Sequence, residues 1–248
     1  MIRPLILGLV LSLSAVNLSA AQVSVAVAAN FSAPLQKIAQ LFEQETGHKL
    51  IVSVGSTGGI YAQIKNGAPF QVFLSADHQT PLKLENEGHG VVGSRFTYAT
   101  GKLALWSAQA GFVDDLGDVL KRNNFQKIAM ANPKLAPYGA AAMQTLMKLG
   151  LWDTLKPKLV QGDNIAQTYQ FVVTENAQLG FVAMSQIVSE GKIIKGSAWR
   201  VPAHWHSPLQ QEAILLPAGK NNPTATAFLA YLKTDKAKSV IRSFGYDI

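Results

Sequence analysis

The stretch that decides the fold is Val52-Ser53-Val54-Gly55-Ser56-Thr57-Gly58-Gly59-Ile60-Tyr61. Its first residues belong to a β-branched run, which predicts a strand. Three glycines then interrupt the run, and Ile60, Ile64 and Ala68 follow at helical spacing. This order of elements is a strand, a glycine-rich turn and the start of a helix. Such a turn points free backbone N–H groups, and the positive end of the helix dipole, at a single site.

The turn carries hydroxyl groups but no cationic side chain. Ser56 and Thr57 supply two O–H donors, and neither Lys nor Arg lies within the turn. The Gly-Lys-Ser/Thr sequence of a Walker loop is absent, and the glycines do not flank Ser56 at the spacing of a nucleophile elbow. We therefore interpret this stretch as half of an anion-binding site made of neutral donors.

The composition indicates a compact globular protein. The chain has 248 residues, of which 48% are hydrophobic and 15% charged, so it can bury a sizeable core in one large or two moderate domains. The formal charge is +7, but the basic residues are scattered, without the basic stripe typical of nucleic-acid binding. Since the chain has no Cys, disulfides, thiolate metal sites and Cys nucleophiles are excluded.

Residues 1–21 have the three-part pattern of a secretory signal peptide. Met1-Ile2-Arg3 is the positive start, an apolar run covers residues 4–16, and Ser19-Ala20-Ala21 is a small-residue cleavage site. A membrane anchor, the alternative, needs about 20 apolar residues, and this run is shorter. We expect export to the periplasm and a mature chain that begins at about Gln22. No Cys follows the cleavage site, which argues against a lipoprotein.

The region before residue 98 alternates strands and helices. Strands are expected at residues 22–29, 50–54 and 70–74, each followed by a helical pattern, which predicts an open parallel sheet. The first of these strands is apolar on both faces, as a central strand covered by helices would be. The expected helices lie between the strands and after residue 80.

A second region of the same type follows, and the chain then returns. Strands are expected at residues 102–106, 127–131 and 179–183, with helices at 116–120, 140–149, 165–175 and 185–190. A last strand at 212–216 and helices at 224–232 and 236–244 would complete the first region. We predict an α/β protein with two lobes, each a mostly parallel sheet flanked by helices. Lobe 1 comprises residues 22–99 and 208–248, and lobe 2 comprises residues 100–207.

Four places share one design, a strand or loop end followed by a helix start with small or polar residues. In open α/β sheets, ligands bind at the carboxyl ends of strands, so two facing lobes would bring four helix N-termini onto one ligand. Converging N–H groups could then replace the water of a buried anion. Each place alone is also what an ordinary helix cap looks like. The four are Asn30-Phe31-Ser32, Ser56-Thr57-Gly58, Pro137-Tyr138-Gly139 and Asp163-Asn164-Ile165.

Five segments carry a family resemblance: Ala28-Ala29-Asn30-Phe31, Gly55-Ser56-Thr57-Gly58-Gly59, the run from Ile64 to Phe70, the run from Val72 to Asp77, and Leu179-Gly180-Phe181-Val182-Ala183. In this order and spacing over residues 22–248, they resemble the periplasmic molybdate-binding proteins of bacterial molybdate ABC transporters. The resemblance implies a Venus-flytrap fold with the ligand in the cleft. It also implies a monomer without catalysis or cofactor that passes molybdate, and by similar size and charge tungstate, to a membrane permease.

The resemblance also implies a set of neutral donors to the oxyanion, with no residue bound directly to the metal. These are Asn30, through its backbone N–H and its side-chain amide, and Ser56 or Thr57, of which Thr57 is the better match. In the second lobe they are Tyr138 and, through its backbone N–H, Ile165.

The chain departs from some members of the family. Those members use a tyrosine hydroxyl from the strand after Leu-Gly-x-Val, where this chain has Ala183. They also have Ser and Ala at the positions of Asn30 and Tyr138. The chain therefore resembles the sub-group without that tyrosine, and it stays open whether Tyr138 supplies a replacement hydroxyl.

Other ligands and activities remain as alternatives. Sulfate is smaller than molybdate, so donors held at the radius of molybdate would lie too far from it. Phosphate at neutral pH carries a proton, for which a site made only of donors offers no acceptor. A ferric site would use adjacent tyrosines and carboxylates, whereas Tyr138 stands alone. An exported hydrolase would need a His in a matching motif next to Ser56 or Thr57. His204 and His206 could hold a metal, but no third ligand has matching spacing.

Overall fold

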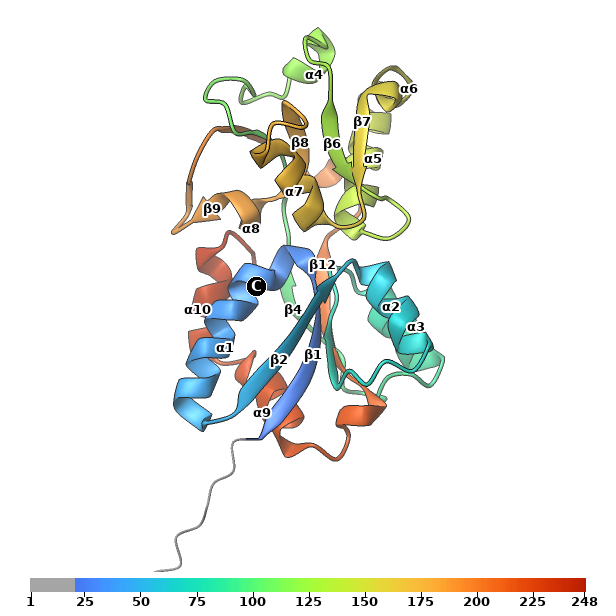
Figure 1. The fold of residues 1–248 in the computed structure, drawn as a ribbon, viewed down its shortest axis with the longest axis vertical. Coiled ribbons are helices and arrows are strands. Elements are labelled where there is room, and N and C mark those ends of the chain that lie inside the picture. The colour runs from blue at the N-terminus through green and yellow to red at the C-terminus, as the bar shows by residue number, and fades with distance from the viewer. Residues whose placement is uncertain (1–20) are drawn as a thin grey trace, which may run out of the picture.

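The structure, a computed structural model, describes residues 21–248, which form two lobes stacked along the long axis of the molecule (Figure 1). The first lobe is built on a five-stranded sheet of order β2-β1-β3-β12-β4, and the second on a five-stranded sheet of order β11-β5-β8-β6-β7. Nearly all of the expected signal peptide lies outside the described residues.

The first lobe begins with the expected alternation of strands and helices. Strands β1 (Gln22–Ala28), β2 (Lys49–Gly55) and β3 (Val72–Leu74) are parallel, with β1 in the middle. The connecting elements are a short 3-10 helix η1 (Ala29–Phe31), α1 (Ser32–Thr46), α2 (Thr57–Lys65) and α3 (Gln79–Asn86). Residues 25–28 are buried, which confirms the expected central strand with two apolar faces.

Two further strands complete this sheet. Strand β12 (Gln210–Leu215) runs antiparallel to both β3 and β4 (Phe96–Thr100). The sequence analysis did not predict β4, because this short, half-polar segment becomes a strand by pairing with β12, more than 100 residues later. Helices α9 (Pro223–Tyr231) and α10 (Asp235–Ser243), with the 3-10 helix η4 (Pro217–Gly219), cover the first lobe as expected (Figure 1).

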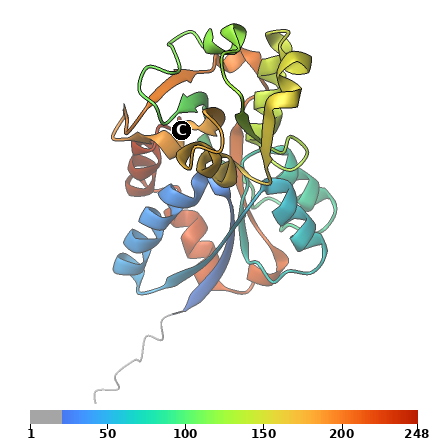
Figure 2. The same ribbon diagram turned by 45° about the horizontal axis from the view of Figure 1, so that its top comes forward.

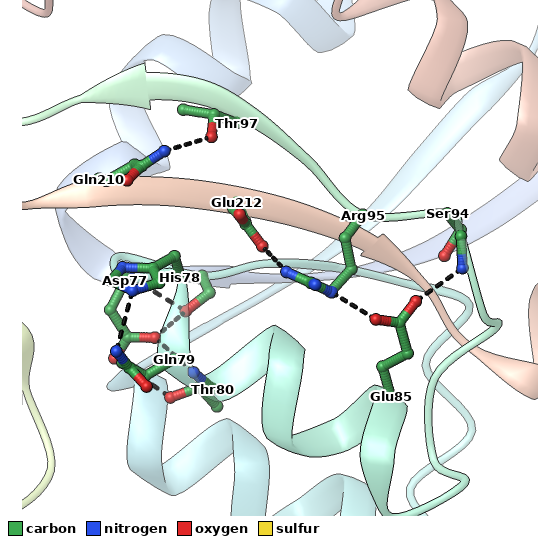
Figure 3. Close-up of polar contacts among 12 residues, drawn as sticks. Asp77, His78, Gln79, Thr80, Glu85, Ser94, Arg95, Thr97, Gln210 and Glu212 are labelled. Atoms are coloured by element: carbon green, nitrogen blue, oxygen red, sulfur yellow. Dashed lines mark hydrogen bonds and ion pairs between the residues drawn. The ribbon is translucent and has the colours of Figure 1, made fainter.

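An ion-pair cluster ties β12 to its neighbours. Arg95, directly before β4, lies between Glu85 of α3 and Glu212 of β12 (Figure 3). Its Nε is 2.7 Å from Glu85 Oε2 and its Nη1 is 2.6 Å from Glu212 Oε2. All three side chains are largely shielded from solvent, with Arg95 24% exposed. The strand that leads back from the second lobe is thus held to both β4 and α3.

The second sheet is mixed. Strands β6 (Ile128–Ala131), β7 (Leu159–Gly162) and β8 (Leu179–Ala183) are parallel. Strand β5 (Leu103–Ser107), where the chain enters the lobe, runs antiparallel to both β8 and β11 (Ser197–Arg200). Like the first sheet, it has two parallel and two antiparallel pairings, because its first and last strands do not belong to βαβ units.

Three helices of the second lobe differ from expectation. Helix α5 (Pro137–Lys148) begins three residues early, because Pro is well suited to the first helical position. Helix α4 (Val119–Arg122) begins later than expected. The helix expected at 185–190 is the shorter helix α8 (Met184–Ile187). It is followed by a hairpin of β9 (Val188–Ser189) and β10 (Lys192–Ile193), because Glu190 and Gly191 adopt positive φ and turn the chain. The other helices are α6 (Trp152–Leu155), η2 (Lys156–Lys158), α7 (Ile165–Val173) and η3 (Ala203–Trp205).

The two crossings between the lobes lie side by side. The N–H of Gly101 on the first crossing donates to the carbonyl of Leu209 on the second, at 2.9 Å. Thr100 also exchanges two backbone hydrogen bonds with Asp247, near the C-terminus. Gly101 has no room for a side chain, since a Cβ there would lie 2.1 Å from the Tyr138 hydroxyl oxygen. Helices α7 and α8 of the second lobe also rest on η1 and α1 of the first (Figure 2).

None of the helices within residues 21–248 is long and apolar enough to cross a membrane.

The carboxylate of Asp114 explains the late start of α4. It accepts hydrogen bonds from the backbone N–H groups of Leu116, Asp118 and Val119 and from the Arg122 guanidinium, at 2.8 to 3.1 Å. These bonds hold residues 114–118 as a turn. Burial alone would raise the pKa of Asp114, but the donors outweigh it and lower the pKa from 3.8 to about 2. The ionised carboxylate therefore favours the folded state.

We expect Asp114→Asn to lower the free energy of unfolding at pH 7 by about 1 kcal/mol, the usual contribution of a capping side chain. Because the folded pKa lies below the unfolded one, the contribution of Asp114 is complete above about pH 4 and is lost as the pH falls toward 2. Urea unfolding at pH 7, 5 and 3 should thus show a variant less sensitive to acid than the original protein. Asp115→Asn is the exposed control, and an equal effect of both changes would contradict the assignment.

Candidate functional site

The four expected helix starts meet at one small cavity between the lobes. Its volume is about 10 Å³, roughly the room that one water molecule needs. All five residues expected to bind the anion are in the lining, and no lining residue is charged. The lining consists of Ala28, Ala29, Asn30, Gly55, Ser56, Thr57, Ala76, Ala136, Pro137, Tyr138, Asn164 and Ile165.

The start of α2 leaves one backbone N–H and two hydroxyl protons without acceptors among residues 21–248. Ser56 is the N-cap, and its Oγ accepts the N–H of Gly59 at 3.3 Å. The N–H of Gly58 donates at 2.8 Å to the carbonyl of Leu135 in the second lobe. Thr57 Oγ1 accepts the N–H of Ala76 at 3.1 Å. Since both hydroxyl oxygens already accept, their protons can be donated into the cavity, together with the N–H of Thr57, the first residue of the helix.

The start of α7 leaves one N–H at the cavity. The side chain of Asn164, the N-cap, accepts the N–H groups of Ala166 and Gln167 at 2.9 and 3.0 Å. The N–H of Ile165, the first residue of the helix, has no acceptor within the helix. Ile165 lines the cavity and is 3% exposed, so this donor is buried.

The start of α5 has no side-chain cap. Ala136 occupies the N-cap position, and Pro137 has no N–H, so the N–H of Tyr138 is the first donor of the helix. The Tyr138 side chain is 1% exposed, and its hydroxyl oxygen accepts from Nε2 of Gln211 at 3.2 Å. Burial raises the pKa of the Tyr138 hydroxyl well above its ordinary value of 10.0, so the group keeps its proton near neutral pH.

Asn30 presents its backbone, not its amide, to the cavity. Its Nδ2 donates to Gln211 Oε1 at 2.9 Å and to the Tyr246 hydroxyl at 3.0 Å, which uses both amide protons. Its carbonyl oxygen accepts from Ser185 and Tyr246, each at 2.8 Å. The backbone N–H of Asn30 lies in the first turn of η1, where helices leave N–H groups free. This geometry favours the expected backbone contact and leaves no proton for the expected amide contact.

The residues that hold Asn30 and Tyr138 were not found from the sequence. Gln211 and Tyr246 lie 181 and 216 positions from Asn30, and no local pattern links such distant residues. Nor does the composition of β12 single Gln211 out, because the strand begins with three polar residues, Gln210-Gln211-Glu212. Gln211 is fully buried, as expected of a polar side chain with several partners.

The arrangement can hold an anion but lacks the groups for nucleophilic catalysis. The lining offers N–H and O–H donors and the positive ends of helices, which stabilise negative charge. It contains neither His nor a carboxylate that could take a proton from Ser56 or Thr57. Within residues 21–248 no group of three His, Asp or Glu side chains could hold a metal ion, so His204 and His206 do not form such a site.

The chain resembles known proteins over almost its whole length. Residues 23–247 match the family described as bacterial extracellular solute-binding protein. The molybdate-binding protein ModA of Azotobacter vinelandii is 57% identical over 98% of this chain and 97% of its own length. ModA of Rhodobacter capsulatus is 49% identical over 97% of this chain and 93% of its own length.

Solved structures give the same result. A periplasmic molybdate-binding protein of Azotobacter vinelandii superposes with a TM-score of 0.89 at 42% identity, over 91% of this chain and 99% of that one. The sulfate-binding protein SubI of Mycobacterium tuberculosis shares the fold, with a TM-score of 0.75 at 13% identity over 91% of this chain and 86% of that one. The chain therefore belongs to the bacterial extracellular solute-binding proteins, and within them to the family of the periplasmic molybdate-binding proteins.

Proposed function

We propose that this protein captures molybdate, and tungstate as an anion of similar size and charge, and delivers it to the permease of an ABC transporter. The observation that carries the proposal is the cavity between the lobes, which is uncharged and lined by donors from four helix starts. The names of the relatives at 57% and 49% identity support the choice of molybdate.

The proposed contacts come from both lobes. From the first lobe they are the backbone N–H of Asn30, the hydroxyl of Ser56, and the hydroxyl and N–H of Thr57. From the second lobe they are Tyr138, through its N–H and hydroxyl, and the N–H of Ile165. Together they would replace the water that a buried dianion loses, a loss that otherwise costs a large free energy. No residue would bind the metal directly, and no cofactor is involved.

The donor set also accounts for selectivity. Ser56 Oγ and Thr57 Oγ1 already accept protein N–H groups, so they would meet the ligand as donors. A ligand without a proton satisfies such donors, whereas hydrogen phosphate would bring a proton that needs an acceptor. Sulfate carries no proton, so discrimination against it would depend on size. Donors fixed at the radius of molybdate would lie too far from this smaller anion to form good hydrogen bonds.

Capture would proceed by closure of the two lobes. In this proposal lobe 1 (residues 22–99 and 208–248) and lobe 2 (residues 100–207) move about the paired crossings at Gly101 and Leu209. The bond from Gly58 to Leu135 joins the lobes beside the cavity and would form on closing. The protein would act as a periplasmic monomer after removal of residues 1–21. It would bind and release its ligand without catalysis and without nucleic acid.

We expect molybdate and tungstate to raise the thermal unfolding temperature of the mature protein. A ligand at 100 times its Kd stabilises the folded state by about 2.7 kcal/mol, which corresponds to roughly 5–10 °C for a chain of this size. Scanning fluorimetry with molybdate, tungstate, sulfate and hydrogen phosphate at equal concentrations measures the effect. A shift with sulfate or phosphate as large as with molybdate would contradict the selectivity, and no shift with any of the four would contradict the function.

Thr57→Val should weaken molybdate binding about tenfold to a hundredfold, because a hydrogen bond to a charged group contributes about 1.5–3 kcal/mol. Thr57→Ser keeps the hydroxyl and should retain most of the affinity. Thr97→Val is the matched control, since Thr97 is exposed and bonds only Gln210 among the described residues. Titration calorimetry on the three variants gives the answer, and unchanged affinity of Thr57→Val would show that only the backbone of Thr57 serves the anion.

A further inference from the structure

The two lobes meet backbone to backbone beside the cavity, where Gly58 contacts Leu135. The N–H of Gly58, the second residue of α2, donates to the carbonyl of Leu135 at 2.8 Å. Apart from the bonds that the paired crossings make, no other backbone hydrogen bond within residues 21–248 joins the lobes. Thr57, which precedes Gly58, and Ala136, which follows Leu135, both line the cavity. The contact therefore lies at the edge of the proposed binding site.

The approach of the lobes at this contact is as close as a glycine allows. A Cβ on Gly58 would lie 3.1 Å from Leu135 Cα and 3.2 Å from its carbonyl oxygen, closer than most Cβ contacts in proteins. The three atoms nearest to such a Cβ all belong to Leu135, so the first lobe alone has room for a side chain here. Since two of these atoms are backbone atoms, a change of rotamer could not relieve the contact.

The loop that carries Leu135 is bonded firmly to the rest of the second lobe. The carbonyl of Asn132 accepts the N–H of Leu135 at 3.1 Å, and the N–H of Asn132 donates to the carbonyl of Gly162 at 2.7 Å. Helix α5, with Tyr138, begins directly after this loop, and α7 begins at Ile165, three residues after Gly162. The N–H donors of the second lobe are therefore fixed relative to Leu135.

The donors of the first lobe are fixed relative to Gly58 in the same way. Thr57 shares the first turn of α2 with Gly58, and its Oγ1 accepts the N–H of Ala76 at 3.1 Å. The Oγ of Ser56, the N-cap, accepts the N–H of Gly59 at 3.3 Å. Both hydroxyl oxygens are thus held by the backbone of the first lobe.

We propose that the contact between Gly58 and Leu135 is the stop that ends closure of the lobes and sets the distance between the donors of lobe 1 and those of lobe 2. Each set of donors is fixed relative to its own side of the contact, so the span between the two sets depends on where the lobes stop. Gly58, without a Cβ, would thus determine the size of anion that the cavity accepts without touching the anion. This inference rests on the proposed capture of an oxyanion by closure of the lobes.

Gly58→Ala tests the proposal, because it adds one methyl group at the stop and keeps the backbone N–H. The variant should bind molybdate at least tenfold more weakly in titration calorimetry, since an extra group forced into a packed contact is unfavourable. Stopped-flow measurements should assign the loss to faster dissociation, because the anion first meets the open form, in which the lobes are apart. Unchanged affinity, or a loss carried by slower association, would overturn the proposal.

The stability of the variant without ligand separates the stop from a folding defect. In the open form the added methyl group does not meet Leu135, and Ala has a higher helix propensity than Gly and a less flexible unfolded chain. The unfolding temperature of Gly58→Ala without ligand should therefore equal or exceed that of the original protein, although its molybdate affinity is lower. A lower unfolding temperature would overturn the proposal, since the methyl group would then be unfavourable without closure.

A second substitution tests whether the stop is made of backbone. When Leu135→Ala is added to Gly58→Ala, the molybdate affinity should be no higher than in Gly58→Ala alone, because Leu135 Cα and the carbonyl oxygen remain in place. Recovery of the affinity would show that the Leu135 side chain is the obstacle, and the backbone stop would be wrong.

The size of the closed site can be measured directly. A crystal structure of Gly58→Ala with molybdate should show a distance from the backbone nitrogen of residue 58 to the Leu135 oxygen longer than 2.8 Å, with the distances inside each lobe unchanged. Sulfate, the smaller anion, should bind this variant no more tightly than the original protein. An unchanged distance, or tighter sulfate binding, would contradict the role of the contact in setting the span.

The outcomes separate this inference from the proposed function. If the original protein does not bind molybdate in the same titrations, the proposed function fails. If it binds molybdate and Gly58→Ala binds it equally well, the function stands and the stop is wrong.

Discussion

The structure depends on backbone N–H groups that helix starts leave without partners. At the start of α7 the cap Asn164 accepts two N–H groups, and at the start of α2 the cap Ser56 accepts one and the carbonyl of Leu135 another. The first N–H of each helix has no acceptor within that helix, and the residues that carry these groups, Thr57 and Ile165, line the cavity. At α5 the same result is reached without a cap, because Pro137 removes one donor and Tyr138 supplies the next. A buried, uncharged cavity of this kind can hold an anion only because these donors replace the water that the anion loses.

The need to unite donors from two lobes explains much of the remaining architecture. The chain crosses between the lobes twice, and the crossings pair at Gly101 and Leu209 immediately behind the cavity. Gly101 leaves space for the Tyr138 hydroxyl, and the bulge in β4 and β12 turns Gln211 toward it. The paired crossings and the wall of the cavity are therefore built in part from neighbouring residues.

The sequence predicted the local parts of this design better than the assembled ones. The glycine-rich turn after β2 and the helix start at Asn164 are readable because capping chemistry lies within a few residues. The family resemblance added the identity of the ligand. Strand β4 and the cluster around Gln211 were missed, because each exists only through partners more than 70 residues away. The side-chain role expected of Asn30 lost support for the same reason, since Gln211 and Tyr246 take its amide protons.

The most direct test of the central claim is a crystal structure of the mature protein grown with molybdate, with anomalous data collected at the molybdenum edge. The account predicts one strong anomalous peak in the cavity between the lobes. The oxygens of the anion should lie within hydrogen-bond distance of the N–H groups of Asn30, Tyr138 and Ile165 and of the Ser56 and Thr57 hydroxyls. A peak elsewhere, or an anion paired with a Lys or Arg side chain, would contradict the claim that neutral donors alone hold the ligand.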